Sequence, residues 1–214
     1  MGLFKKILNT PIADLRRYDE KALSKLKMIN AATVILPEKP TSEFMQAYST
    51  INVNCAKTLY TDENTNIIFD NGIAYYDDNN VDPDVIYFVS GITVIDTAEK
   101  APNVITNGIV VTNKDAKINN LATNGLNIKS SIKFESSKFY NSKLVIENDY
   151  LENLPENVLI VSTGVLKFES NVDYNLLKNK AIEFVSTADI IAPKELISIV
   201  EIKSHTTGRF KTNG

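Results

Sequence analysis

One short phrase recurs through residues 51–128 of this chain. Its copies are INVNCAK (51–57), IIFDNGIAYY (67–76), YFVSGITVI (87–95), VITNGIVV (104–111) and LATNGLNI (121–128). Each copy places a small residue between apolar ones, and these small residues are 17 to 19 positions apart: Cys55, Gly72, Gly91, Gly108 and Gly125. A regular spacing near 20 residues indicates units that bury their apolar faces against their neighbours. The phrase therefore predicts a stack of short coils.

The same column of small residues continues in both directions: Ser142 follows Gly125 by 17 positions, and the spacings widen to 22 to 24 at Ala32, Gly164 and Ala188. Four positions before each small residue the chain is apolar, with the exception of Lys138. One and three positions after it, apolar residues alternate with other residues, as Ile92 and Val94 do, and this period is typical of strands. The phrase therefore predicts one strand for each coil.

The wider coils have room for a short helix, which the 17-residue coils lack. Thr41 precedes an apolar pair and can cap a helix running to Tyr48, and Pro193 can open a helical turn. Residues 149–154 and 172–177 suit the same role. We expect a mainly β chain with short helices, built as a single parallel β-solenoid over residues 28–205.

Residues 1–27 differ in kind. Leu3, Phe4, Ile7 and Leu8 fall on one helical face, and a second apolar stripe follows at Ala22, Leu23 and Leu26. Because a solenoid needs a cover for its first coil, we interpret this segment as an N-terminal helical cap. An interfacial membrane helix is the alternative interpretation. Residues 206–214 are interpreted as a polar C-terminal tail.

The residue just before the small residue is polar in most coils. It is asparagine at Asn54, Asn71, Asn107, Asn124 and Asn141. Stacked asparagines can hydrogen-bond the backbone of the next coil at a turn, so we predict a buried structural ladder. An exposed row that binds a ligand such as a sugar is the competing interpretation.

The longer coils resemble leucine-rich-repeat proteins, because a strand, an asparagine column and a return through a short helix follow one another. The 17-residue coils resemble a parallel β-helix. The resemblance covers about residues 27 to 205, and it implies a binding or scaffolding role, since leucine-rich-repeat proteins chiefly offer a face to other proteins.

Candidates for chemistry are few. His205 is the only histidine and Cys55 the only cysteine, so a nucleophile–histidine site would have to use them. The densest cluster is the acidic loop with Asp77, Asp78, Asp82 and Asp84, whose oxygens could hold Ca²⁺. Its spacing is not that of an EF-hand, and a solvated turn is the preferred interpretation. We expect no cofactor.

The composition bounds the function further. The net charge is −3 and the sequence pI about 5.3, which is not the basic balance of a nucleic-acid-binding protein. A lone cysteine and the absence of a secretory signal suit a cytoplasmic protein, and the abundance of Lys, Ile and Asn suggests a bacterial source.

The sequence thus predicts a non-enzymatic repeat protein that acts as a scaffold or through protein–protein interaction. A carbohydrate-binding or carbohydrate-active β-helix protein is the alternative. We also expect the last coil, after Ile202, to associate with a second copy of the chain, because only a polar tail with Phe210 remains to cover it.

Overall fold

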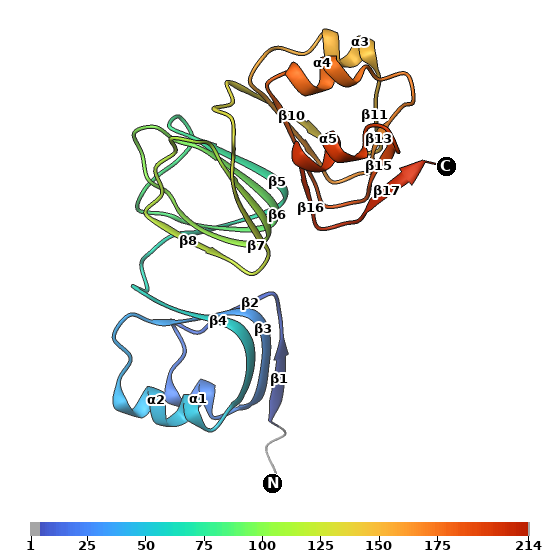
Figure 1. Ribbon diagram of the computed structural model, residues 1–214. Coiled ribbons are helices and arrows are strands. Elements are labelled where there is room, and N and C mark those ends of the chain that lie inside the picture. The colour runs from blue at the N-terminus through green and yellow to red at the C-terminus, as the bar shows by residue number, and fades with distance from the viewer. Residues whose placement is uncertain (1–4, 214) are drawn as a thin grey trace. The chain divides into compact units, whose positions relative to one another are not determined.

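The computed structural model describes residues 5–213 of the 214-residue chain (Figure 1). The chain is mainly β, with 48% of residues in strands and 14% in helices. The described strands pair in parallel, and the described residues include five short helices. The chain divides into two compact units at Asn66 and Ile67. This boundary lies inside the segment 28–205 that the sequence assigns to one solenoid.

The first unit is a four-stranded sheet with two helices. Its elements are β1 (Lys6–Asn9), β2 (Ile12–Asp14), α1 (Glu20–Leu23), β3 (Leu26–Pro37), α2 (Ser42–Ser49) and β4 (Asn52–Thr61). Strand β3 pairs with β1 and β2 along its length and also with β4. The helices lie side by side on one side of the curved sheet (Figure 1), and Leu23 and Phe44 bury their side chains in the core beneath them.

Helix α2 begins where the sequence predicts it. The Thr41 side chain accepts a hydrogen bond from the backbone N–H of Phe44, as a capping threonine does. In α1 the carboxylate of Asp19 caps in the same way, accepting from the backbone N–H of Ala22.

The described part of residues 1–27 does not form the predicted helical cap. Residues 6–14 are extended in β1 and β2, and only Glu20–Leu23 are helical. Pro11 lies between the two strands, where its lack of an N–H interrupts the pairing, and its carbonyl accepts from the N–H groups of Ala32 and Thr33. The apolar spacing that predicted a helix in this segment is therefore also compatible with two short strands and a turn between them. Leu3 and Phe4 of the predicted face lie outside the described residues.

The pairing of β3 with β4 also differs from the predicted register. Ala31 lies opposite Cys55, so the small residue of this coil is Ala31 and not Ala32. Cys55 is partly buried against the core of the first unit.

The second unit begins with a five-stranded sheet. Its strands are β5 (Ile67–Asp77), β6 (Ile86–Asp96), β7 (Asn103–Thr112), β8 (Asn120–Thr123) and β9 (Leu126–Lys129). Gly72, Gly91 and Gly108 lie opposite one another, in the register that the sequence predicts. A Cβ on Gly108 would collide with the carbonyl oxygen of Gly91, so close approach of successive strands requires glycine in this column. As expected, these short coils contain no helix.

The rest of the second unit forms two further sheets and three helices. One sheet contains β10 (Ser136–Tyr140), β12 (Val158–Ser162), β14 (Ile182–Ser186) and β16 (Ser204–Thr206), and the other contains β11 (Leu144–Ile146), β13 (Leu166–Phe168), β15 (Ile190–Pro193) and β17 (Phe210–Asn213). The helices α3 (Asn148–Glu152), α4 (Tyr174–Asn179) and α5 (Ile197–Ile202) return the chain from one coil to the next. Helix α4 lies beside α3 and beside α5 (Figure 1). Helices α3 and α4 overlap their predicted segments, and α5 begins later than the predicted turn after Pro193.

The predicted polar tail is another coil. Residues 204–206 pair with β14, and Phe210 lies opposite Ile190 in β15. Phe210 packs against the core of this part of the unit, which holds the buried rings of Phe168 and Phe184 at 5.2 Å. The chain after residue 205 therefore continues the stack and does not form a separate tail.

The single continuous solenoid is not confirmed. The described strands belong to four sheets: β4 and β5 belong to different sheets, and so do β9 and β10. Within the second unit, the β5–β9 sheet packs against the β10–β16 sheet through a buried apolar layer. Ile92 and Val94 of β6 lie in this layer with Leu159 and Val161 of β12. Because the odd and even positions of β6 are both buried, its sequence is a nearly continuous apolar run.

Candidate functional site

The asparagine column is exposed, which contradicts the predicted buried ladder. Asn71, Ser90 and Asn107 lie opposite one another on β5, β6 and β7, and Asn124 follows at the end of β8. The side chains of all five predicted ladder residues are open to solvent: Asn54, Asn71, Asn107, Asn124 and Asn141.

The polar side chains that face inward lie one residue before the asparagine column. Successive side chains of a strand point to opposite faces, so the residue two before the small residue faces inward. Thr106 is buried, and its hydroxyl lies 2.7 Å from that of Thr93. In the later coils, Ser186 donates to the carbonyl of Gly164 and Thr206 to that of Ala188, each in the preceding coil, whereas Ser162 donates to Gly164 within its own coil. Hydroxyls of buried or half-buried side chains thus bond neighbouring coils in place of the predicted asparagines.

Near the C-terminus, threonines that stand just before the small residue of a coil do bond neighbouring coils. The Thr187 hydroxyl donates to the carbonyl of Thr163 at 3.4 Å, and that of Thr207 donates to the carbonyl of Thr187 at 3.2 Å. The column therefore changes character along the chain, from exposed amides in β5–β8 to bonded hydroxyls in the last coils.

The acidic loop uses its carboxylates as backbone caps. Asp77 accepts from the N–H groups of Asn79 and Asn80, and Asp82 accepts from that of Asp84. Asp78 accepts from three consecutive N–H groups, of Ala98, Glu99 and Lys100. The backbone bonds from Lys100 and Ala98 lower the pKa of Asp78. No metal-binding cluster of three or more acids, histidines or cysteines occurs among residues 5–213.

His205 belongs to a group that the sequence analysis missed. Its Nε2 lies 2.8 Å from Oε1 of Glu183, and the other carboxylate oxygen of Glu183 accepts from the Ser130 hydroxyl. The Glu183 side chain is only 2% exposed. The carboxylate lies between the hydroxyl and the imidazole, so His205 is not placed to deprotonate Ser130 as a catalytic base would. The group joins the end of β9 to β14 and β16.

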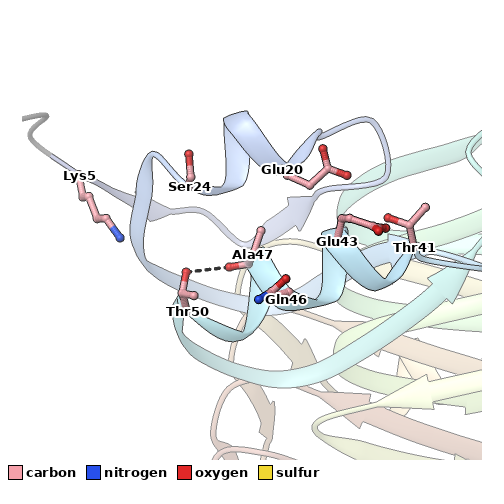
Figure 2. Close-up of a pocket in the computed structure, with 8 residues that line it drawn as sticks. All are labelled: Lys5, Glu20, Ser24, Thr41, Glu43, Gln46, Ala47 and Thr50. Carbon is pink, nitrogen blue, oxygen red and sulfur yellow. Dashed lines mark hydrogen bonds between the residues drawn. The ribbon is translucent and has the colours of Figure 1, made fainter.

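A depression in the first unit lies between α1 and α2 (Figure 2). Glu20, Glu43, Gln46 and Lys5 stand around it, and Thr50 donates a hydrogen bond to the carbonyl of Ala47. The side chains of Glu20, Glu43, Gln46 and Lys5 are exposed, whereas small-molecule sites are mostly apolar and enclose their ligand. The depression therefore has the character of solvated surface.

Within the second unit, strand β5 lies at the edge of its sheet. Within its unit, β5 pairs only with β6, along all eleven of its residues. Ile68 and Phe69 on this edge strand are 39% and 54% exposed. The side chain of Asn80 donates to the carbonyl of Tyr75, so the open edge ends near that residue.

Natural sheets protect long edges with lysine, proline or a bulge. The other long strand at the edge of a sheet, β4, carries the exposed Lys57 at its centre. Strand β5 contains neither lysine nor proline, and its pairing with β6 has no bulge. The carboxylate of Asp70, its one acid before Asp77, accepts a 2.6 Å hydrogen bond from the Tyr76 hydroxyl.

Comparisons with protein-family models, with curated proteins and with solved structures give no match for this chain. Among the described residues, no helix is both long enough and apolar enough to cross a membrane.

Proposed function

We propose that this protein is a non-enzymatic scaffold of β-solenoid type that binds a protein partner through the open edge of β5. The single observation that supports the proposal is this edge within the second unit, because an edge strand without lysine, proline or a bulge is a surface on which β-strand addition can operate. Backbone hydrogen bonds would provide much of the affinity, and the side chains that alternate along β5 would provide the specificity. The resemblance to leucine-rich-repeat and β-helix proteins, the bacterial source and the cytoplasmic location belong to the same proposal.

Exposed apolar residues at the edge add to this support. Single exposed apolar residues are common on protein surfaces, but Ile68 and Phe69 are adjacent and lie on a strand with unpaired backbone groups. Their side chains leave β5 on opposite faces. A bound strand would therefore cover apolar surface on both sides of the sheet.

Photo-crosslinking in the cell that makes the protein tests the proposal. A photoreactive phenylalanine analogue replaces Phe69, and in a control chain it replaces Tyr174, which is 41% exposed on α4. We expect a defined polypeptide adduct at position 69 and none at 174, and we expect Ile68→Lys to abolish the adduct. Equal adducts at both positions, or none at 69, would contradict the proposal.

Carbohydrate binding is the second candidate, and the row formed by exposed Asn71, Asn107 and Asn124 with half-buried Ser90 favours it. Strands in a sheet are about 4.8 Å apart, so the row presents amide and hydroxyl groups at regular intervals, as a linear polysaccharide does. A glycan array probed with the protein and with Asn107→Ala tests this candidate. Binding that Asn107→Ala weakens would support it.

Association through the C-terminal coil also stays a proposal. Strands β16 and β17 end their sheets, and Ile202 beside them is 76% exposed. Exposed Lys211 and Arg209 on this coil oppose strand pairing between two copies. Sedimentation at micromolar concentration would decide whether the chain dimerises.

A further inference from the structure

Taken by itself, the second unit has a sheet from which one strand is missing on the outer side of β5. The first sign is Gly72. In β6 and β7, the place where a glycine Cβ would lie is filled by the carbonyl oxygen of the preceding strand: Gly91 meets the oxygen of Gly72, and Gly108 meets that of Gly91. Gly72 has a φ of +87°, yet nothing lies within 4 Å of its Cβ position. Within the second unit, the space that a preceding strand's carbonyl would fill is open.

The second sign is the exposure of two side-chain columns. Phe69, Phe88 and Ile105 lie opposite one another on β5, β6 and β7, and the rings of Phe69 and Phe88 are 6.0 Å apart. Phe88 is 4% exposed, whereas Phe69 is 54% exposed. The neighbouring column changes in the same way, from 4% at Tyr87 to 39% at Ile68. One more strand on the outer side of β5 would cover both residues.

The third sign is charge. Residues 67–99 contain no lysine or arginine, and Asp70, Asp77 and Asp78 lie on β5 or just after it. A ligand with basic residues beside its apolar core therefore complements this edge.

We infer that the partner presents an extended polypeptide segment, which adds to β5 as a parallel strand, places a carbonyl oxygen against Gly72 and packs apolar side chains on Ile68 and Phe69. The direction follows from the described pairings of this sheet, which are all parallel. Basic residues flank the segment, since the edge that receives it is acidic. This inference rests on the proposed function and specifies the chemistry of the partner.

The chain itself provides a probe. Strand β7, Asn103–Thr112, already acts as the preceding strand for β8 and β9, and it presents Val104 and Ile105 in the two columns that are open on β5. The probe is a synthetic peptide of this sequence with two added lysines and a fluorophore. A control peptide carries N-methyl groups on alternate amides, which removes the donors of strand pairing but keeps the side chains.

Fluorescence anisotropy measures binding to the full chain. We expect the peptide to bind the unchanged protein and Tyr174→Lys equally. Binding should be weaker by about tenfold or more with Phe69→Lys or with the N-methylated peptide, because a lysine on the edge and the loss of backbone donors both oppose pairing. Hydrogen exchange should show that the bound peptide protects amides of β5.

Three outcomes would overturn the inference: no binding, equal binding of the N-methylated peptide, or β5 amides that are already protected in the free monomer, which would mean that another strand of the same chain covers the edge. Failure of the peptide together with a positive crosslink at position 69 would leave the proposed function in place and would remove only the parallel strand. Circular dichroism of each variant verifies that it is folded.

Discussion

The imidazole of His205 lies 2.8 Å from the carboxylate of Glu183, which is buried where the β5–β9 sheet packs against the β10–β16 sheet. The second oxygen of the carboxylate accepts from the Ser130 hydroxyl. A buried charge without partners is strongly destabilising, whereas an apolar replacement of the whole group is often tolerated. The Ser130–Glu183–His205 group therefore stabilises the contact between the two sheets only when all three residues are present.

We expect Ser130→Ala to lower the free energy of unfolding by about 1–3 kcal/mol, because it removes a donor from a buried carboxylate. Glu183→Leu in the Ser130→Ala background should restore much of this loss, since it removes the buried charge itself. Chemical denaturation of the single and double variants measures both effects. Additive losses in the double variant would contradict this account.

The glycine column predicts a difference between two otherwise similar substitutions. Gly108→Ala places a Cβ on the carbonyl of Gly91, whereas Gly72→Ala meets open space, and both glycines have positive φ. Gly108→Ala should therefore destabilise by about 1–3 kcal/mol more than Gly72→Ala, because overpacking adds to the backbone strain. Thermal unfolding of the two variants side by side provides the comparison, and equal losses would refute the close approach.

Substitutions in the exposed asparagine column and in the inward hydroxyl column should differ in their effect on stability. We expect Asn107→Ala and Asn124→Ala to change stability by less than about 0.5 kcal/mol, as exposed positions usually do. Ser186→Ala should cost about 1–2 kcal/mol, because its buried hydroxyl donates to Gly164 and accepts from the N–H of Ala188. A larger loss at Asn107 than at Ser186 would restore the asparagine ladder.

Alkaline pH should destabilise the second unit. Burial, with hydrogen bonds to Asp96 and Asp70, raises the pKa of Tyr75 and of Tyr76, and burial beside Tyr140 raises that of Tyr150. A raised pKa contributes stability that is complete below the unfolded value of about 10 and is lost as the pH rises above it. Denaturation from pH 8 to pH 12 should show this decline, and Tyr76→Phe should make it shallower.

Acid should release the loop that Asp78 holds. Its pKa is lowered, so its contribution is complete above the unfolded value of about 3.9 and is lost as the pH falls further. Asp78→Asn should lower the melting temperature at pH 7 more than at pH 2.5. Added Ca²⁺ should leave the melting temperature of the unchanged chain where it is, and a rise that depends on Asp78 would revive the metal site.

The sequence by itself determined the local structure and much of the register. Alternation after each small residue predicts strands, and the 17-residue spacing places Gly91 opposite Gly108, because both follow from a period that can be counted along the chain. The cap of α2 at Thr41 is equally local. The exposure of Asn71 and Asn107 was within reach too, since strand alternation assigns Thr106 to the interior.

Only the tertiary structure decided where the stack of coils is interrupted and which distant residues come into contact. The apolar residues Ile92 and Val94 would face outward in a lone coil, and they are buried because a second sheet, formed by residues more than 40 positions later, packs on them. Ser130, Glu183 and His205 carry no periodic signal, because a contact across 53 residues depends on how whole sheets pack. The open edge of β5 likewise cannot be recognised from its own sequence, because Ile68 and Phe69 resemble Tyr87 and Phe88. Whether such a pair is exposed or buried depends on whether another strand pairs beside it in the folded unit.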